Sequence, residues 1–586
     1  MWQWAALALA IAGGLAWHRL GPRLEALRSR LPGPTWAWEL GCAAAALLLA
    51  VTPLVMAWAE LFPAHAPMGP DSNNYVGSAL AFETGRWELY FDDRYPAYPW
   101  LVALAASDGA SVPTAGVEVS MALTALTALP LYATGRLLAG RTAGVMGAVL
   151  GLRQAVMLDV GRSFTHYPLA TLLDATLLAL GIALARTGSP IAAWALAATA
   201  GLALSADPKQ LPLALLTLLV AAGAGALRPR PWWHRVQLAL AVLLPLPAAQ
   251  LLVGRYRLGL LTLEGITVRT PMNFTADLRA HMNEGFALGE PGALAELLPS
   301  YLRVLSGIGP KGDGVDPSFI NALPMHYLDA WPLWLGLLLP LPVLLLWRAR
   351  SRRSVWPLAV VMLLGLQALS ASSVVRLHYA HRYAMPHLAQ APVLALSGVS
   401  LVGGPLATAG LALGWVLPGA PMASLDASYL GRQGNHTDLW VGREVSVELD
   451  AIANADAWLP EDAVIHDMST DRPMPILAAA RPYIWCSTTH DGCGSAMKQA
   501  SGPIAAVVWA DDFMSSELPG GPRELIQREG GRMPAALGSC WELVGSIQPE
   551  AGLYLWTCDD SPRPWPDARK APRAPTWGTQ GTKAPG

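Results

Sequence analysis

The chain has 586 residues, of which 53% are hydrophobic and only 14% are charged. A soluble globular protein carries about 25% charged residues, so these proportions exclude an ordinary soluble enzyme and predict an integral membrane protein. The formal net charge of −2 argues against nucleic acid as the main partner, because it provides no excess of positive charge.

Apolar segments long enough to cross a membrane recur along most of the chain. The predicted spans are 2–18, 36–59, 114–135, 142–158, 168–185, 189–206, 209–226, 236–253, 328–347, 355–372, 385–402 and 404–420. The first segment lacks a basic start and a clear cleavage site, so we do not interpret it as a cleaved signal peptide. The expected fold of residues 1–420 is an all-α polytopic membrane bundle of about 12 transmembrane helices.

Arginines in the links between spans predict the orientation of the bundle. Each of these links follows an odd-numbered span, so all of them lie on one side, which should be the cytoplasm. The polar segments at about 60–113, 254–327 and beyond 421 are then expected on the outer side. Arg is far commoner than Lys, which hints at a GC-rich bacterial genome, and the expected location is the bacterial inner membrane. The orienting residues are Arg19, Arg23, Arg28, Arg30, Arg136, Arg141, Arg186, Arg228, Arg230, Arg235, Arg348, Arg350, Arg352 and Arg353.

Charge rises and apolar runs shorten beyond residue 421. A helical pattern at 444–458 and short apolar runs at 463–467, 505–510 and 553–557 predict a soluble α/β domain over 421–560. The tail at 561–586, rich in Pro and Gly, is expected to be disordered. Four cysteines in this region favour two disulfides in an oxidising periplasm, with unpaired or metal-bound thiols as the alternative. They are Cys486, Cys493, Cys540 and Cys558.

The first outer loop contains acidic and aromatic residues in a compact pattern. Asp71 opens a predicted short helix, and Tyr75, four residues later, shares its face. The apolar stretch at 100–106 is too short to span and is expected to lie in the membrane interface. Between them lie Asp92, Asp93, Arg94 and Tyr95, the last of which opens a Tyr-Pro-x-Tyr-Pro run.

This loop resembles the GT-C glycosyltransferases, in particular the glycosyltransferase 39 branch of protein mannosyltransferases and aminoarabinose transferases. The similar features are an acid soon after an early span, a Tyr, the tripeptide Glu83-Thr84-Gly85 and the Tyr-Pro-x-x-Pro run. Ser205-Ala-Asp-Pro-Lys209 and Arg382-Tyr383-x-x-Pro386 are similar to later junctions of the same family, and the resemblance covers about residues 36–400. The family often has Asp-Glu in the first loop, whereas Ser72 follows Asp71 here. The second acid is therefore missing, or Asp92 or Asp93 takes its place.

The resemblance implies a membrane glycosyltransferase that moves a hexose or pentose from a polyprenyl-phosphate carrier on the outer leaflet. The acceptor would be a lipid, a glycan or a protein, and the displacement would be inverting. Two alternatives remain: a transporter or flippase, and a non-catalytic lipid-binding protein of the same fold. Against a transporter, we find no paired broken helices or internal repeat, and the charged residues gather at one membrane face rather than at the midplane. The non-catalytic alternative stays open because Ser72 stands where the family often has a second acid.

Sugar transfer from a lipid phosphate requires a base to deprotonate the acceptor hydroxyl, and cations to stabilise the phosphate leaving group. We predict Asp71 as the base, because partial removal from water makes a carboxylate a stronger base. The alternative is a plain helix N-cap. Asp92 and Asp93 could bind the acceptor or a divalent cation, or could form a solvated turn beside Arg94. No cofactor is certain, and a divalent cation is the candidate.

Several cationic side chains fall at the predicted outer ends of spans, where a charge is costly unless it is paired, snorkelling or functional. We predict that Lys209 and Arg382 bind the lipid phosphate, with snorkelling to headgroups as the alternative. His166 could orient the phosphate or the acceptor, or could be a satisfied interfacial side chain. His381 and His378 have a spacing that can bind metal on a helix, but a polar cavity lining is the stronger interpretation. The further candidates for substrate binding are Arg162 and Arg376.

Overall fold

The structure is a computed structural model of the whole chain. The residues that it describes are 2–28, 35–61, 75, 78–79, 82–83, 95–106, 112–154, 157, 160–207, 211–245, 247–248, 338, 340–352, 354–377, 385–416, 460, 464–467, 483–485, 504–509, 541–548 and 551–557. The chain divides into two compact units. The first comprises Met1–Ala64, Ser120–Arg162 and His166–Leu430, and the second comprises His65–Val119, Ser163–Thr165 and Gly431–Gly586.

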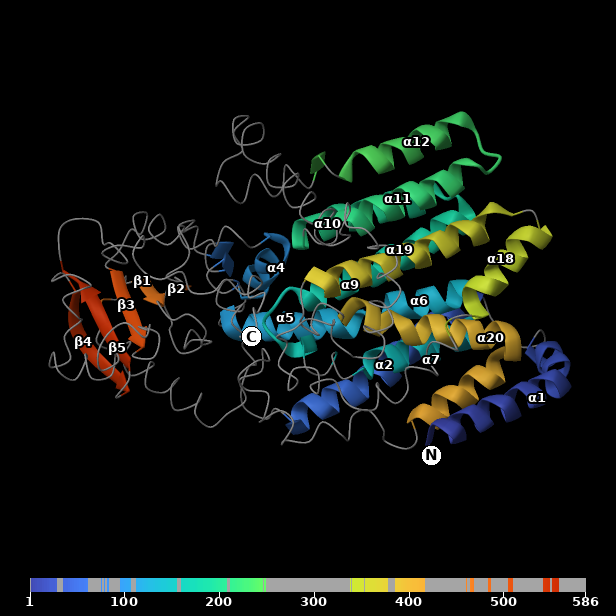
Figure 1. The fold of residues 1–586 in the computed structure, drawn as a ribbon, viewed down its shortest axis with the longest axis horizontal. Coiled ribbons are helices and arrows are strands. Elements are labelled where there is room, and N and C mark those ends of the chain that lie inside the picture. Colours follow the sequence, from blue (N-terminus) through green and yellow to red (C-terminus); the bar gives the residue numbers. More distant parts are fainter. Residues whose placement is uncertain are drawn as a thin grey trace, which may run out of the picture. The chain divides into compact units, whose positions relative to one another are not determined.

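The first unit is a helical bundle in which α9, α10, α11 and α12 lie side by side, with α19 packed against α9 and α11 (Figure 1). Within the described residues, every predicted span overlaps at least one helix, and the span at 114–135 overlaps both α5 and α6. The helices are α1 (Trp2–Arg28), α2 (Thr35–Leu61), α5 (Val112–Leu126, which begins in the second unit), α6 (Ala128–Leu138), α7 (Arg141–Leu152), α9 (Tyr167–Thr187), α10 (Pro190–Ala206), α11 (Leu211–Ala226), α12 (Trp232–Leu243), α18 (Pro340–Arg352), α19 (Val355–Leu377) and α20 (Met385–Val416).

Four of the described helical stretches are long and apolar enough to cross a membrane. They are Trp36–Met56, Ala115–Leu138, Tyr167–Thr187 and Met385–Gly414. Several shorter apolar helices accompany them. The helical, membrane-type character of the predicted bundle is therefore confirmed in the described residues, while the number of spans stays a prediction.

The predicted boundary between the last two spans is a break inside α20. Gly404 has φ 77° and ψ −178°, a conformation that side-chain-bearing residues rarely adopt, and Pro405 follows it. A Cβ atom at Gly404 would lie only 2.1 Å from the ring of Trp17 on α1. Glycine is thus required both for the turn and for the close approach of α1.

Helices α6 and α7 also approach each other through glycines. A Cβ atom at Gly135 would lie 2.7 Å from the Cα atom of Gly144, and one at Gly144 would lie 2.6 Å from the carbonyl oxygen of Tyr132. Membrane helices pack in this way because their association depends on close backbone contact rather than on expulsion of water.

An ion-pair cluster fixes α2 to the start of α7 and the end of α6. Glu39 accepts hydrogen bonds from Arg136, with Nη2–Oε1 at 2.8 Å, and from Arg141, with Nη2–Oε1 at 2.6 Å. The Tyr132 hydroxyl donates to the same carboxylate over 3.0 Å. The two arginines that predicted a cytoplasmic link therefore also close the bundle at that end.

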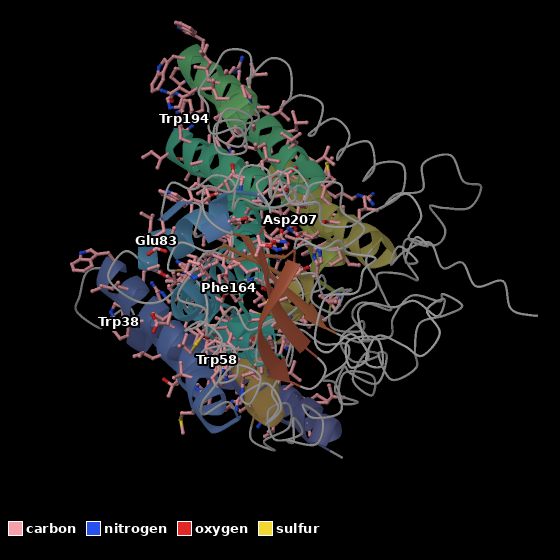
Figure 2. All side chains as sticks on the ribbon, turned by 90° about the vertical axis from the view of Figure 1, so that its left-hand side faces the viewer. Trp38, Trp58, Glu83, Phe164, Trp194 and Asp207 are labelled. Atoms are coloured by element: carbon pink, nitrogen blue, oxygen red, sulfur yellow. The ribbon has the colours of Figure 1, made fainter. Side chains whose placement is uncertain are left out.

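The outer surface of the bundle is apolar. Trp38 is 49% exposed and Trp194 is 39% exposed, and both lie at its edge (Figure 2). Large apolar side chains are exposed along α1, α2 and α12 as well, for example Leu15, Leu48 and Val236. Such a surface is suited to contact with lipid chains rather than with water.

The second unit contains a five-stranded mixed sheet. Its strands are β1 (Val464–Asp467), β2 (Tyr483–Trp485), β3 (Ile504–Trp509), β4 (Trp541–Gln548) and β5 (Ala551–Trp556), in the order β2-β1-β3-β5-β4. Strand β1 pairs in parallel with β2 and β3, and β5 pairs antiparallel with β3 and β4. The three predicted strands are β1, β3 and β5, and the sequence pattern missed β2 and β4. The predicted helix at 444–458, the four cysteines and the tail lie outside the described residues, so the α/β domain stays a prediction.

We expect Gly144→Ala to lower the melting temperature of the purified protein, because the added methyl group meets the backbone of α6. Overpacking of this kind costs about 1–3 kcal/mol. Gly223→Ala on α11 is the matched control, since nothing lies within 4 Å of a Cβ atom at that position. Equal melting temperatures for the two variants, measured in the same detergent, would contradict the close packing of α6 on α7.

Candidate active site at the outer end of α9

The structure describes some of the predicted site residues and not others. Those outside are Asp71, Asp92, Asp93, Arg94, Lys209, His381 and Arg382, and of Arg376 only the helical backbone in α19 is described. Tyr75, Tyr95, Arg162 and His166 are described with their side chains, and all are buried. The proposed roles of all these residues remain predictions.

The aromatic residues of the first outer loop form a small core within the second unit. The rings of Tyr75 and Tyr98 meet edge to face with centroids 5.3 Å apart, and Tyr98 packs on Phe164 at 6.0 Å. The Tyr98 hydroxyl donates to the carbonyl oxygen of Gly116 over 3.1 Å. Tyr98 belongs to α4 (Ala97–Ala106), the apolar stretch that the sequence marked as too short to span. Tyr75 therefore lies in a packed aromatic cluster.

In the first unit, α9 and α10 form a hairpin that brings two distant polar residues together. The helices are joined by the short link at 188–189, so the start of α9 lies next to the end of α10. His166, which caps α9, places its Nε2 atom 3.4 Å from Oδ2 of Asp207, which follows α10. The two residues are 41 positions apart in sequence.

The His166–Asp207 pair is almost completely buried. The two side chains are 9% and 8% exposed, and the imidazole also packs against the ring of Tyr167 at a centroid distance of 4.3 Å. A carboxylate that accepts a hydrogen bond from one ring nitrogen fixes the tautomer and the orientation of an imidazole. His166 is among the predicted site residues, whereas Asp207 appears only within the Ser205–Lys209 junction and has no predicted role. A hairpin of the two consecutive spans would have indicated that His166 and Asp207 lie close together.

Arg162 lies just before this pair, in the short 3-10 helix η2 (Val160–Arg162). The Thr124 hydroxyl on α5 donates to the carbonyl oxygen of Gly161 over 2.7 Å, and a Cβ atom at Gly161 would meet Thr124 at 2.9 Å and Trp58 at 3.4 Å. The turn is therefore clamped between α2 and α5. Burial lowers the pKa of Arg162 to about 10, so the guanidinium stays charged at neutral pH. A buried guanidinium is a suitable partner for a phosphate.

A second arginine in the same stretch is not among the residues predicted from the sequence. Arg153 directly follows α7 and is partly buried, and its Nε atom has no hydrogen-bond partner among the residues that the structure describes. An arginine in a link predicted to face the outer side is a candidate for phosphate binding. Arg153 was not recognised as one because the predicted span at 142–158 includes it.

Asp174 departs from the expectation that charged residues gather at one membrane face. It lies seven residues beyond Tyr167 in α9, about 10 Å along the helix, and has no exposed surface. Its Oδ1 atom accepts a hydrogen bond from Gln367 of α19 over 2.9 Å. A carboxylate within a predicted span indicates a functional site, yet Asp174 is not among the residues predicted from the sequence.

No protein-family model matches the chain, and no curated protein matches it either. Solved structures do resemble it. The Archaeoglobus fulgidus oligosaccharyltransferase in the apo form is 14% identical, with 81% of this chain and 70% of that chain covered and a TM-score of 0.44. ArnT from Cupriavidus metallidurans in the apo state is 12% identical, with 89% and 98% covered and a TM-score of 0.37. ArnT bound to undecaprenyl phosphate is 13% identical, with 90% and 99% covered and a TM-score of 0.33.

These similar structures are GT-C glycosyltransferases, the superfamily that the sequence patterns resemble. At such low identities, and with TM-scores below 0.5, the likeness by itself establishes neither a shared fold nor an activity for this chain.

The described residues do not form a recognisable metal centre. No group of three or more His, Cys, Asp or Glu side chains among them is placed to hold a metal ion. The His166–Asp207 pair supplies only two such side chains, and Asp71, Asp92 and Asp93 lie outside the described residues. The archaeal oligosaccharyltransferase has also been solved in complex with Zn and sulfate. The His166–Asp207 pair alone is too small to complete a divalent metal site, and the divalent cation stays a prediction.

We expect Thr124→Val to loosen the turn that holds Arg162, because the buried carbonyl of Gly161 loses its donor. The loss of one buried hydrogen bond costs about 1 kcal/mol in stability. Hydrogen exchange of the backbone at 160–166 should rise at the same time. Thr187→Val is the matched control, since that hydroxyl is exposed and bonds only to Ala183 of its own helix and to Ser189 in the link that follows. Unchanged exchange in Thr124→Val would contradict the clamp.

Proposed function

We propose that the chain is a membrane glycosyltransferase that transfers a sugar from a polyprenyl-phosphate carrier to an acceptor hydroxyl at the outer membrane face. The observation that carries the proposal is the buried polar group at the outer end of α9. There, Arg162 and the His166–Asp207 pair lie within a few residues of the helix start. The class of donor comes from the family that the sequence motifs resemble.

The reaction proposed is a displacement at the anomeric carbon. The acceptor oxygen forms a bond to that carbon while the bond from the carbon to the phosphate oxygen breaks. The acceptor proton passes to a base, and polyprenyl phosphate leaves with the bonding electron pair. The developing negative charge is therefore on the phosphate, where a fixed cation lowers the barrier most.

In this proposal Asp71 accepts the acceptor proton, and Lys209 and Arg382 hold the lipid phosphate. Arg162 adds a third positive charge, held in place before substrate binds. Asp207 is a positioning residue, because it orients the His166 imidazole. The start of α9 adds the positive end of a helix dipole, which favours an anion nearby. The remaining predicted contacts for donor and acceptor are Tyr75, Asp92, Asp93, Arg94, Tyr95, Arg376 and His381.

The proposal places the protein in a bacterial inner membrane, with the site and the 421–560 region in the periplasm. The placement follows from the arginines in the links after odd-numbered spans. A site at the outer membrane face fits a donor whose lipid tail stays in the bilayer.

One observation favours the transporter alternative. Asp174 and Gln367 place polar groups inside the bundle, and ionisable residues at such depth often mark ion or proton pathways. Proteoliposomes separate the two functions, because a transporter gives counterflow uptake without formation of a glycosylated product.

We expect Asp71→Asn to reduce sugar transfer at least about 100-fold, the usual contribution of a general base. Transfer of radiolabelled sugar from polyprenyl phosphate is measured in proteoliposomes containing the full-length protein. Glu83→Gln, an exposed acid of the same loop, is the control and should keep normal activity. Full activity of Asp71→Asn would exclude Asp71 as the base.

We expect Arg162→Met to raise the KM for the polyprenyl-phosphate donor and to lower kcat, because the fixed charge beside the phosphate is lost. A charge-assisted contact is worth about 1.5–3 kcal/mol, which corresponds to roughly a 10- to 150-fold loss in kcat/KM. Arg230→Met at the opposite end of the bundle is the matched control, since its side chain is exposed and bonds to Thr187. Equal kinetics in both variants would remove Arg162 from the site.

A further inference from the structure

A polar cluster lies inside the first unit, where α9, α19 and α20 pack together (Figure 1). Asp174 of α9 has no exposed surface, and Gln367 and Gln390 are 5% and 3% exposed. Gln367 donates from Nε2 to Oδ1 of Asp174 over 2.9 Å, and the amide of Gln390 lies beside the same carboxylate. Each of the three helices therefore contributes one oxygen-bearing side chain to a single buried point.

Three oxygen atoms of this cluster have no hydrogen-bond partner among the described residues. They are Oδ2 of Asp174, Oε1 of Gln367 and Oε1 of Gln390, and all three are buried. His387 places Nδ1 at 4.0 Å from Oδ2 of Asp174, which is beyond hydrogen-bond reach. These three acceptors lie on three different helices.

An unpaired carboxylate and two bare amide oxygens are costly in an apolar bundle, so something must supply positive charge or donors. A proton on Asp174 supplies one donor and leaves at least one amide oxygen bare. A water molecule has two donors for three acceptors and leaves the charge uncompensated. All three oxygens can coordinate a small cation at once, and the cation neutralises the charge of the carboxylate.

The charge of the cluster selects a monovalent ion. Only one carboxylate is present, so a monovalent cation gives a neutral site, whereas a divalent cation would leave a net positive charge in a low-dielectric interior. Hard cations prefer carboxylate and amide oxygens, which are the groups presented here. A small cation approaches the carboxylate oxygen more closely than a larger one and gains more Coulomb energy, which favours sodium over potassium.

We infer that Asp174, Gln367 and Gln390 form an intramembrane binding site for one sodium ion. The ion joins α9, α19 and α20, because each helix supplies one of the three coordinating oxygens. The site is distinct from the proposed transfer site at the start of α9, and it does not depend on that function.

The test is thermal unfolding of the full-length protein in detergent or nanodiscs. Sodium replaces potassium or N-methylglucamine at constant ionic strength and constant pH. We expect sodium to raise the melting temperature by several degrees and potassium to have little effect, since a ligand that binds only the folded state stabilises it by mass action. Asp174→Asn and Gln390→Leu should abolish the difference between the ions. Thr171→Val, one turn away on α9, is the matched control, because its buried hydroxyl bonds only to Tyr167 of the same helix.

Binding of radioactive sodium to the wild-type protein gives a second measurement that does not depend on the variants being folded. Saturable binding of one ion per chain, with competition by sodium and not by potassium, supports the site. Equal melting temperatures in all three salts together with no sodium binding overturn it. A melting temperature that responds to pH and not to sodium also overturns it, because the cluster then binds a proton.

Discussion

Inside an apolar bundle, each polar group must find its partner within the protein, because no water is there to take that role. Many of the side-chain hydrogen bonds in the first unit follow from this constraint. Thr171, Thr176 and Ser397 each donate to a carbonyl oxygen four residues earlier in their own helix. Such side chains are satisfied locally and leave the packing surface apolar. The polar groups that cannot be satisfied in this way gather at helix ends or meet across helices.

The helix ends show how the same constraint positions charge. On the predicted cytoplasmic side, Arg186 donates to the carbonyl oxygen of Leu137 at the end of α6, and Arg228 donates to that of Ala185 near the end of α9. These arginines use carbonyl groups that a helix cannot satisfy itself, and they complement the negative end of the helix dipole. On the opposite side, Arg162 and the His166–Asp207 pair are buried. The charged side chains at one end therefore bind helix carbonyls, and those at the other end are withdrawn from solvent.

The sequence predicted the positions of the helices well because apolar length is a strong local signal. It also predicted β1, β3 and β5, which are short apolar runs. It missed the pairing of His166 with Asp207, since that depends on the α9–α10 hairpin and not on any local spacing. It missed Asp174 because one carboxylate barely changes the mean hydropathy of a 20-residue window. Hydropathy reports the average environment of a helix, whereas a site depends on single residues that depart from it.

The α9–α10 hairpin has a mechanical consequence. Its two arms are joined at Gly188, which adopts a left-handed conformation with φ 62°, and α9 extends about 30 Å from that joint to His166. A tilt of a few degrees at the joint would move the far tips by more than an ångström, enough to break or form a contact such as the one between His166 and Asp207. Arg228 and Arg230 donate to the carbonyl oxygens of Ala185 and Thr187, which end α9 just before the joint. The distance between His166 and Asp207 is therefore sensitive to the backbone angle at Gly188, at the other end of the hairpin.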